Sequence, residues 1–403
     1  MPNEIDPRLL SRLATNRTSR RRFMGGGAAA AAAAILGPSF LAACGGNKGG
    51  GSSSSSGTPQ ASAPADDGKP ASGRLRVSNW PLYMADGFVA AFQTASGLTV
   101  DYKEDFNDNE QWFAKNKEPL SRKQDIGADL VVPTQFMAAR ILQLGWLNEI
   151  RESRWSNKKN LRADLLNTKV DPGRKATAPY MTGMVGLAYN KAATKKDIKG
   201  IDDLWDPEFK GRVSLLSDTQ DGLGMIMQSQ GNSVEDPTEE AVQKAVDLVK
   251  EQKDKGQIRR FTGNDYADDL AAGNIAVAQA YSGDVVQLQA DNPDLHFIIP
   301  ESGGDWFIDT MTIPYTTQNQ AAAEAWINYI YDRPNYAKLV AFVQYVPVLS
   351  DMNDELDKVD PKLSKNPLIV PPEADAKKLK SWAPLTDEQT TKFNSMYAAV
   401  TGG

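Results

Sequence analysis

The sequence predicts an α/β protein with two lobes, each a mixed sheet flanked by helices, and a ligand-binding cleft between the lobes. Strand-like runs alternate with helix-like runs, and about 330 residues follow a polar N-terminal region. That length usually exceeds a single hydrophobic core, and strand–helix alternation is typical of sheets with parallel strands. Extended segments rich in glycine and threonine are expected to connect the two halves.

The first 43 residues predict an export signal. The run "TSRRRFM" places consecutive arginines before three glycines, seven alanines and the ending "LAAC". A basic front, a weakly apolar middle and small residues at the end form the pattern of a secretory signal. The paired arginines indicate the Tat route.

Cys44, the last residue of "LAAC", is the only cysteine in this sequence. A single cysteine builds no intramolecular disulfide, and "LAAC" resembles a lipobox, in which the cysteine is lipidated. A chance cysteine and a transmembrane anchor are the alternatives, but Gly37 and Pro38 interrupt the apolar run, which is marginal in length for a membrane span. We therefore expect a lipoprotein anchored to the outer face of the cytoplasmic membrane.

Residues 44–73 predict a Gly/Ser-rich disordered tether. After Cys44 the segment carries no large apolar side chain and cannot contribute to a core. A Gly/Ser-rich chain of this length spans about 30 Å on average. The whole sequence has 51 acidic and 45 basic residues, and an acidic balance disfavours nucleic acid as a partner.

The folded part is expected to begin with three strand–helix pairs. The strand-like runs are "RLRVSN", "LTVDYKE" and "ADLVVPT", followed by helices at 86–95, at 110–121 and in "QFMAARILQLG". The pattern resumes with "RVSLLSD" and "GNIAVAQAY", followed by helices at 222–230 and in "SGDVVQLQAD", with a long polar-faced helix at 238–255. The expected crossings between the lobes are 178–190, 306–314 and the proline-rich 365–375.

The ends of several expected strands carry aromatic and acidic residues. Ligands of open α/β sheets bind beyond the carboxyl ends of the strands, so these residues are the candidates for a binding site. They are Trp80, Tyr83, Thr134, Phe136, Asp218, Asp221, Tyr281, Asp284, Phe307, Asp309 and Tyr345. An ordinary core position is the alternative for each aromatic ring, above all for Phe136 and Phe307. Asp218 is equally suited to capping the helix that follows it.

The sequence gives little support for catalysis or for a metal site. His296 is the only histidine and has no cysteine or second histidine as a partner, so a structural role on a strand is expected. We found no zinc motif, phosphate loop or nucleophile elbow, and we expect no enzyme activity, cofactor or metal. The rival from another class is a glycan-acting surface enzyme that uses Asp218 and Asp221 as a carboxylate pair.

The candidate residues suit a flexible polyamine. The methylene groups of a polyamine favour flat apolar walls, and its ammonium groups favour carboxylates. Aromatic faces also attract cations, at about 0.5–2 kcal/mol per contact, and a carboxylate adds a charge-assisted hydrogen bond. Asp309, flanked by "WFI" and "TMTIP", needs a cationic partner if it is buried.

From residue 74 onward, the chain resembles the extracytoplasmic spermidine/putrescine-binding proteins of ABC importers. The matching pieces stand in the family's order: "NWPLY", "ADLVVPT", "PYMTGMVGLAYN", "DDLWDPEFKGRVSLLSD", "FIDTMTIP" and "AWINYIYDRPNYAKLVAFVQYVP". The resemblance implies a type II periplasmic-binding-protein-like fold and delivery of the ligand to a permease. It divides the chain into lobe I, residues 74–181 and 310–366, and lobe II, residues 182–309 and 367–403. We expect a monomer.

The resemblance also implies roles for the candidate residues. Asp309 matches the acid that holds an ammonium group, and the 218–221 turn matches the region that supplies further acids. Asp218, Thr219 and Asp221 all remain possible there, and Asp221 is favoured. The matched aromatic residues are Trp80 and Tyr83 as first-lobe walls, Phe136, Tyr281, Phe307 and Tyr345.

Leu82 departs from the pattern, because polyamine binders often carry an acid at this position. This departure leaves putrescine, spermidine or another amine-bearing solute open as the ligand. Within the wider family, an amino acid derivative or an iron chelate is the alternative. A receptor for an anion or a metal chelate would need arginines or free helix N-termini in the cleft, and the strand ends offer almost none.

Overall fold

The computed structural model describes residues 62–81, 83–106, 109–169 and 171–402. The predicted export signal, Cys44 and most of the predicted tether lie outside the described residues, as does Leu82. The described residues belong to one compact unit, Gly57–Gly403.

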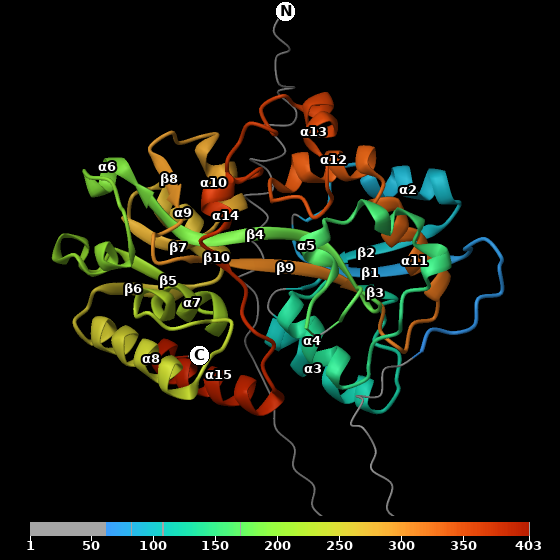
Figure 1. Ribbon diagram of the computed structural model, residues 1–403, viewed down its shortest axis with the longest axis horizontal. Helices are drawn as coiled ribbons and strands as arrows, with labels where there is room; N and C mark the ends of the chain where they lie inside the picture. The colour runs from blue at the N-terminus through green and yellow to red at the C-terminus, as the bar shows by residue number, and fades with distance from the viewer. Residues whose placement is uncertain (1–61, 82, 107–108, 170, 403) are drawn as a thin grey trace, which may run out of the picture. The chain divides into compact units, whose positions relative to one another are not determined.

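Within the described residues, ten strands form one sheet with the order β2-β1-β3-β9-β4-β7-β5-β6, while β10 pairs with β9 and β8 pairs with β4. The centre of the sheet is the antiparallel pair of β4 (Thr177–Asn190) and β9 (Gly304–Thr312), which runs through the middle of Figure 1. The two predicted strand-like crossings are therefore neighbours, and they join two half-sheets into one continuous sheet.

The half-sheets on either side of this pair are largely parallel, as the strand–helix alternation predicts. β1 pairs in parallel with β2 and β3, and β5 pairs in parallel with β6 and β7. Antiparallel pairing of β7 and β8 with β4 makes the sheet mixed. The remaining strands are β1 (Arg74–Asn79), β2 (Thr99–Glu104), β3 (Leu130–Val131), β5 (Val213–Leu216), β6 (Ile258–Thr262), β7 (Val277–Tyr281), β8 (Leu295–Ile298) and β10 (Leu379–Lys380).

Helices lie on both sides of the sheet. In Figure 1, α3, α4, α7, α8 and α15 lie below it, and α2, α10 and α12 lie above it. The helices are α2 (Phe88–Ser96), α3 (Asn109–Ser121), α4 (Gln135–Gln143), α5 (Ala163–Leu166), α6 (Lys191–Thr194), α7 (Thr219–Ser229), α8 (Glu239–Asp254), α9 (Ala267–Ala271), α10 (Ser282–Gln289), α11 (Gln320–Ile330), α12 (Arg333–Val343), α13 (Asn353–Val359), α14 (Glu373–Ala376) and α15 (Asp387–Thr401). The 3₁₀ turns are η1 (Glu152–Arg154), η2 (Ser156–Asn160), η3 (Ile201–Trp205), η4 (Pro207–Phe209) and η5 (Asn264–Tyr266).

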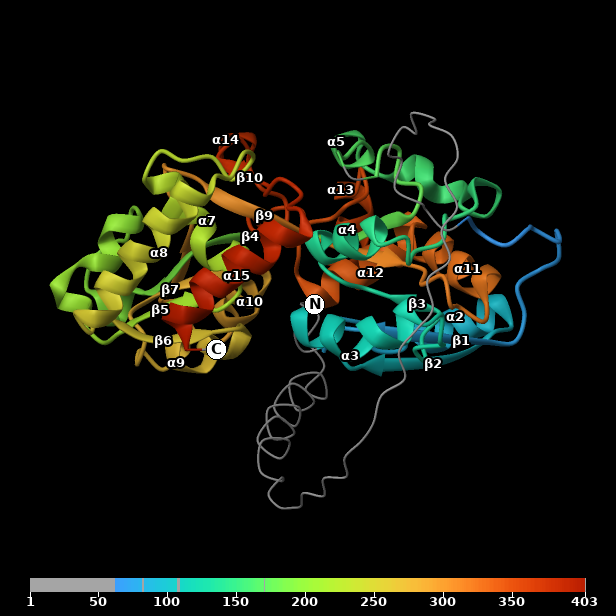
Figure 2. The ribbon, with the colours of Figure 1, turned by 90° about the horizontal axis from the view of Figure 1, so that it is seen from below.

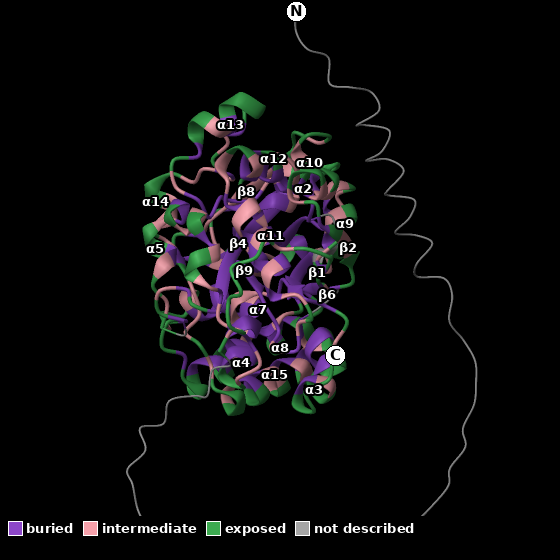
Figure 3. Cartoon of the chain, turned by 90° about the vertical axis from the view of Figure 1, so that its right-hand side faces the viewer, coloured by how far each residue is buried: buried purple, intermediate pink, exposed green. Residues whose placement is uncertain are grey.

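Two large hydrophobic cores lie on either side of the β4–β9 pair. One core contains Leu75, Trp155, Trp326 and Tyr336, and the other contains Leu187, Met225, Val249 and Phe393. Every residue of β4 is buried, and Figure 3 shows β4 and β9 mainly in the colour of buried residues. Two cores joined by buried strands agree with the predicted two-lobed fold.

The last part of the predicted tether is held against the protein. The guanidinium of Arg154 donates a hydrogen bond from Nε to Asp66 at 3.0 Å and contacts the same carboxylate through Nη2. The amide of Asn319 donates to the carbonyl of Ser72 at 2.8 Å. The structure therefore differs from the expectation of a free tether over residues 62–73, because an aspartate of the tether pairs with an arginine far along the chain.

Candidate functional site

The candidate site begins on one face of β9. Alternate residues of a strand point to the same face, so Asp305, Phe307 and Asp309 share a face. Tyr83, in the loop after β1, donates its hydroxyl to Asp309 Oδ2 at 2.7 Å. Thr134, the N-cap residue of α4, donates its hydroxyl to Asp309 Oδ1 at 2.8 Å. The residues that follow β1 and β3 therefore meet at Asp309.

Asp309 is a buried acid, and no lysine or arginine among the described residues pairs with it. Burial raises its pKa to about 6, although the hydroxyls of Tyr83 and Thr134 act in the opposite direction. Within the described residues, no lysine or arginine contributes to this pKa. A buried carboxylate is costly unless a positive charge accompanies it, so the site is prepared for a cationic ligand.

A second carboxyl group, that of Asp221 at the start of α7, lies near Asp309. Tyr281, at the end of β7, donates its hydroxyl to Asp221 Oδ2 at 2.7 Å. Burial raises the pKa of Asp221 to about 6, and the charge of Asp309 adds to this increase. The two acids therefore lie close enough to interact, and a cation between them would relieve both.

Asp218 has a different role from Asp221. Its side chain accepts hydrogen bonds from the backbone nitrogens of Gln220 at 2.9 Å and Asp221 at 3.4 Å, and it caps α7. Thr219 is buried at the start of the same helix. Of the three residues that the sequence left open, Asp221 is the one whose carboxylate meets the hydroxyl of a predicted wall residue.

Four aromatic rings connect the two acids. Tyr83 and Tyr345 have ring centroids 5.9 Å apart, and Tyr345 and Phe307 have centroids 5.4 Å apart. Tyr281 and Phe307 also lie 5.4 Å apart, and all three contacts are edge-to-face. These four predicted residues therefore form a continuous wall.

Two glycines allow these rings to pack closely. A Cβ atom at Gly183, on β4, would lie 2.4 Å from the ring of Phe307, and one at Gly283, on α10, would lie 2.6 Å from the ring of Tyr345. Real Cβ atoms do not approach so closely, so both positions require glycine. Close ring packing thus explains why glycine stands at residue 183 in "MTGMVG" and at residue 283 in "YSGD".

Asp284 belongs to the outer part of this wall. Tyr266 donates its hydroxyl to Asp284 Oδ2 at 2.8 Å, and Tyr345 lies 3.4 Å from Asp284 Oδ1. Tyr266 also accepts a hydrogen bond from the backbone nitrogen of Tyr281 at 2.9 Å. Asp284 and Tyr266 therefore fix the positions of two wall residues.

Trp80 and Phe136 lie beside a smaller aromatic cluster. The indole of Trp80 donates to the carbonyl of Val132 at 2.7 Å, and its ring lies 4.9 Å from that of Phe106. Phe136, on α4, packs against the same cluster. Trp80 and Phe136 therefore pack against this cluster and do not belong to the row of four rings that joins the two acids.

Sequence reasoning missed three polar residues around the site. Tyr266 follows β6, whose short sequence "IRRFT" was not recognised as a strand. Had this strand been predicted, the rule that ligands bind beyond strand ends would have identified Tyr266. Asn109, just after β2, donates to Thr134 Oγ1 at 3.1 Å. Asp305 lies two residues before Phe307 and four before Asp309, so strand alternation in the sequence already predicts that it shares their face.

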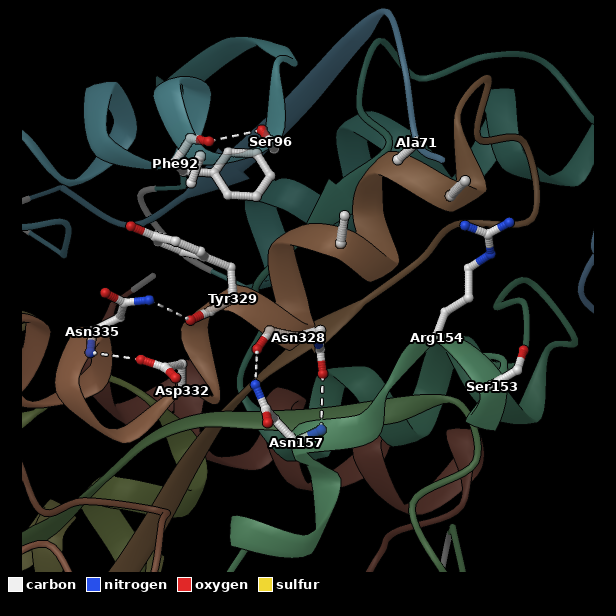
Figure 4. A pocket seen from close by; sticks show the side chains of 13 residues that line it. Ala71, Phe92, Ser96, Ser153, Arg154, Asn157, Asn328, Tyr329, Asp332 and Asn335 are labelled. Atoms are coloured by element: carbon white, nitrogen blue, oxygen red, sulfur yellow. Dashed lines mark hydrogen bonds between the residues drawn. The ribbon is translucent and has the colours of Figure 1, made fainter. Parts of the chain in front are cut away.

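The two described surface pockets lie away from these residues. Figure 4 shows one of about 520 Å³, bordered by Arg154, Asn157 and Tyr329. The other, of about 370 Å³, is lined by Trp306 and Ile308, which point to the opposite face of β9 from Asp309.

The described residues contain neither a metal-binding cluster nor a membrane-spanning helix. No group of three or more histidine, cysteine, aspartate or glutamate side chains in this part of the chain is arranged to hold a metal ion. Across the same residues, no helix combines the length and apolar character needed to cross a membrane. His296 lies on β8 and stacks on Tyr189 with ring centroids 5.2 Å apart.

Comparison with known proteins identifies the family. Residues 87–371 match the bacterial extracellular solute-binding proteins, and the chain belongs to this family. It is 27% identical over 331 residues to the spermidine/putrescine-binding periplasmic protein 1 of Haemophilus influenzae, covering 81% of this chain and 86% of that protein. It is 28% identical over 283 residues to the spermidine/putrescine-binding periplasmic protein of Escherichia coli, covering 70% and 78%.

Solved structures share the fold. The Tp0655 (TpPotD) lipoprotein of Treponema pallidum matches with a TM-score of 0.72 at 22% identity, covering 82% of this chain and 100% of that one. The spermidine/putrescine ABC transporter substrate-binding protein PotD of Streptococcus pneumoniae matches with a TM-score of 0.70 at 22% identity, covering 82% and 98%. The predicted two-lobed α/β fold of a periplasmic binding protein is therefore confirmed.

Proposed function

We propose that this solute-binding protein captures a polyamine, putrescine or spermidine, and delivers it to the permease of an ABC importer. The observation that carries the proposal is the pair of acids formed by buried Asp309 and partly buried Asp221. Each is hydrogen-bonded to a tyrosine, and no lysine or arginine of the described residues pairs with either. An ammonium group at each acid would supply the missing charge.

The aromatic wall suits the rest of such a ligand. Rings of Tyr83, Tyr345, Phe307 and Tyr281 run between the two acids, and a polyamine places methylene groups between its ammonium groups. Each ring can also attract a nearby cation, at about 0.5–2 kcal/mol. The relatives named as spermidine/putrescine-binding proteins support the same ligand class.

Capture would involve closure of the two lobes. We assign residues 74–181 and 310–366 to lobe I, and residues 182–309 and 367–403 to lobe II. Asp309, the last residue of the first lobe II segment, is hydrogen-bonded to Tyr83 and Thr134 of lobe I, whereas Asp221 is hydrogen-bonded to Tyr281 within lobe II. A ligand held between these two groups therefore stabilises the closed arrangement and shifts the population toward it. Thr134, Phe136, Trp80 and Asp284 complete the proposed site.

The N-terminal sequence and the family support a location outside the cytoplasm. A bacterial extracellular solute-binding protein acts outside the cytoplasm, and "LAAC" provides a lipid anchor at Cys44 after export by the Tat route. We propose a monomeric lipoprotein on the outer face of the cytoplasmic membrane, with no role in catalysis and no nucleic-acid partner.

Calorimetric titration of the purified protein with putrescine and then spermidine tests the function. Micromolar or tighter binding of either compound supports it, because such affinity requires about 8 kcal/mol of binding free energy. No binding of either compound by a folded sample contradicts it and directs attention to other amine-bearing solutes.

A further inference from the structure

Asp305 is a third buried acid in line with the two acids of the proposed site. It lies on β9, four residues before Asp309 and on the same face of the strand. Only 1% of its surface is exposed. The spacing places its Cα roughly 13 Å from that of Asp309 along the strand.

The surroundings of Asp305 leave half of its carboxyl group without a partner. Gln228, on α7, donates its side-chain amide to Asp305 Oδ1 at 2.8 Å. Within the described residues, Asp305 Oδ2 has no hydrogen-bond partner. A Cβ atom at Gly224 would lie 1.9 Å from this oxygen, so the helix approaches Asp305 closely only because residue 224 is glycine.

Asp305 and Asp221 are placed together by α7. Residues three and seven positions apart share one face of a helix, so Asp221, Gly224 and Gln228 all face β9. The charge of Asp221 contributes to an increase in the pKa of Asp305 to well above its usual range, and burial is the larger cause. The three carboxyl groups thus form a row: Asp309, Asp221 and Asp305.

The other elements around Asp305 supply no counter-charge. Its neighbour on β4 is Val185. Its neighbour on β10 is Lys380, whose ammonium group lies 3.9 Å from the carboxylate of Glu235 and whose side chain is 46% exposed. The two acids nearest to Asp305 in this arrangement are Asp221, on α7, and Asp309, on the same face of β9. A buried oxygen without a partner is costly, and here nothing in the described protein relieves it.

We propose that Asp305 is the third anionic group of the ligand site and gives the receptor a preference for a triamine over a diamine. The proposal rests on the proposed function and specifies its substrate class. A diamine neutralises two acids, and four methylene groups are too short to span the distance from Asp309 to Asp305. A triamine brings a third ammonium group toward the Asp221–Asp305 end, where Asp305 loses its proton and becomes the counter-ion.

The Asp305→Asn variant tests this assignment because asparagine keeps the shape and still accepts the bond from Gln228. Titration with spermidine and putrescine should show an unchanged diamine affinity and a triamine affinity reduced about tenfold, which corresponds to about 1.4 kcal/mol. A purely structural role predicts that both affinities change by the same factor or that neither changes, and either result would overturn the proposal.

A second measurement needs no variant. Calorimetry of the wild-type protein in buffers with different ionisation enthalpies gives the number of protons released on binding. At neutral pH, spermidine should release about one more proton than putrescine, because Asp305 ionises only in the triamine complex. Equal proton release contradicts the role of Asp305 while leaving polyamine capture intact; absence of binding by the wild type contradicts the proposed function itself.

Discussion

The side chain of Asp309 is held in position by hydrogen bonds within the protein, yet its negative charge still favours a cationic ligand. Two hydroxyl groups, from Tyr83 and Thr134, donate hydrogen bonds to its two oxygens. Hydroxyl groups provide hydrogen bonds but no positive charge, so burial still raises its pKa. The residue is thus held in position by neutral donors, and its charge remains available to a cation.

Replacement of Asp309 by asparagine should separate binding from folding. The variant keeps an oxygen for one hydroxyl but cannot form a charge-assisted bond, which contributes about 1.5–3 kcal/mol. We expect polyamine affinity to fall roughly 10- to 100-fold, with no loss of thermal stability at pH 7.5, because the folded protein no longer buries a charge. Titration and thermal unfolding measure the two effects.

Asp218→Asn provides the matched control for that variant. Asn is a good N-cap residue, and Asp218 bonds to the backbone at the start of α7. Its affinity should therefore stay within about twofold of the wild type, a change of roughly 0.4 kcal/mol. An equal loss in both variants would mean that Asp309 has no special role in holding the ligand.

The acidic pair should also make binding depend on pH. The pKa values of Asp309 and Asp221 are about 6 in the folded protein, above the ordinary aspartate value of 3.8. Their shifts therefore stabilise the ligand-free fold most below pH 4, and this contribution is lost as pH rises through 6. Ligand binding needs the ionised acids, so affinity should increase over the same range.

Thermal unfolding with and without spermidine, at pH 5 and pH 7.5, measures this dependence. The increase in melting temperature caused by the ligand should be larger at pH 7.5. An increase of the same size at both pH values would show that neither acid titrates in this range or that the ligand does not contact them.

The structure brings together the candidate residues at the strand ends that were recognised in the sequence, and it adds Tyr266 after a strand that was not recognised. Tyr83, Asp221, Tyr281, Phe307, Asp309 and Tyr345 follow from the rule that ligands bind beyond strand ends, and the structure brings them together. The hydroxyl bonds between them depend on side-chain directions set by tertiary packing. No local sequence pattern encodes those directions.

At the scale of elements, the aromatic wall depends on the backbone of β4. Gly183 lies opposite Phe307, and these two residues are cross-strand partners in the β4–β9 pair. A side chain at this position would occupy the volume of the Phe307 ring. The glycine content of this crossing, visible in the sequence, is therefore part of the site.

The Gly183→Ala substitution should displace Phe307 and weaken binding. Its Cβ would lie 2.4 Å from the ring, and overpacking of this kind costs about 1–3 kcal/mol. We expect a comparable loss of unfolding free energy in denaturant titrations and at least about a tenfold loss of polyamine affinity.

Gly263→Ala is the control, since a Cβ atom there would meet nothing within 4 Å. This variant should bind as the wild type does. Normal binding by Gly183→Ala would show that the ring of Phe307 does not form part of the ligand wall.

The first three strand–helix pairs, the central crossings and α8 followed from hydrophobic patterning, whereas the later helices α11, α13 and α15 were not predicted. Two further misses have a clear physical reason. β6 was missed because two arginines break its apolar alternation. The docking of residues 62–73 was missed because polar, glycine-rich chain gives no core signal, and its contacts depend on Arg151 and Arg154 far along the chain. Long-range ion pairs leave no local trace in a sequence.

At the scale of the whole described unit, β4 and β9 are not the only link between the proposed lobes. Polar contacts also join α15 to α3 and α4. Arg140, on α4, contacts Glu110 at 3.0 Å and Asp387 at 2.8 Å. Asn394, on α15, donates to Glu110 at 3.3 Å. α15 extends toward α4 in Figure 2. Since α15 packs on α7 and α8 of lobe II, these polar contacts cross between the proposed lobes.

Arg140→Gln should loosen the closed arrangement slightly. Both acidic partners are partly exposed, and exposed ion pairs contribute about 0.2–1 kcal/mol each. We expect polyamine affinity to fall roughly two- to fivefold, mainly through faster dissociation, which stopped-flow measurements can resolve. Arg122→Gln removes an exposed pair between Glu118 of α3 and Arg122, the residue that follows this helix, and should leave the dissociation rate unchanged. Equal rates in all three proteins would exclude a role for Arg140 in closure.

The position of Trp80 has an optical consequence. Its indole is half-buried, held by the carbonyl of Val132 and in contact with Phe106, whereas Trp155 and Trp326 are each only 1% exposed in the core. Indole emission responds to the polarity and charge of its surroundings. A cation that enters between the lobes would therefore alter the emission of Trp80 more than that of the core tryptophans, and the protein carries an intrinsic fluorophore for following capture and release without a label.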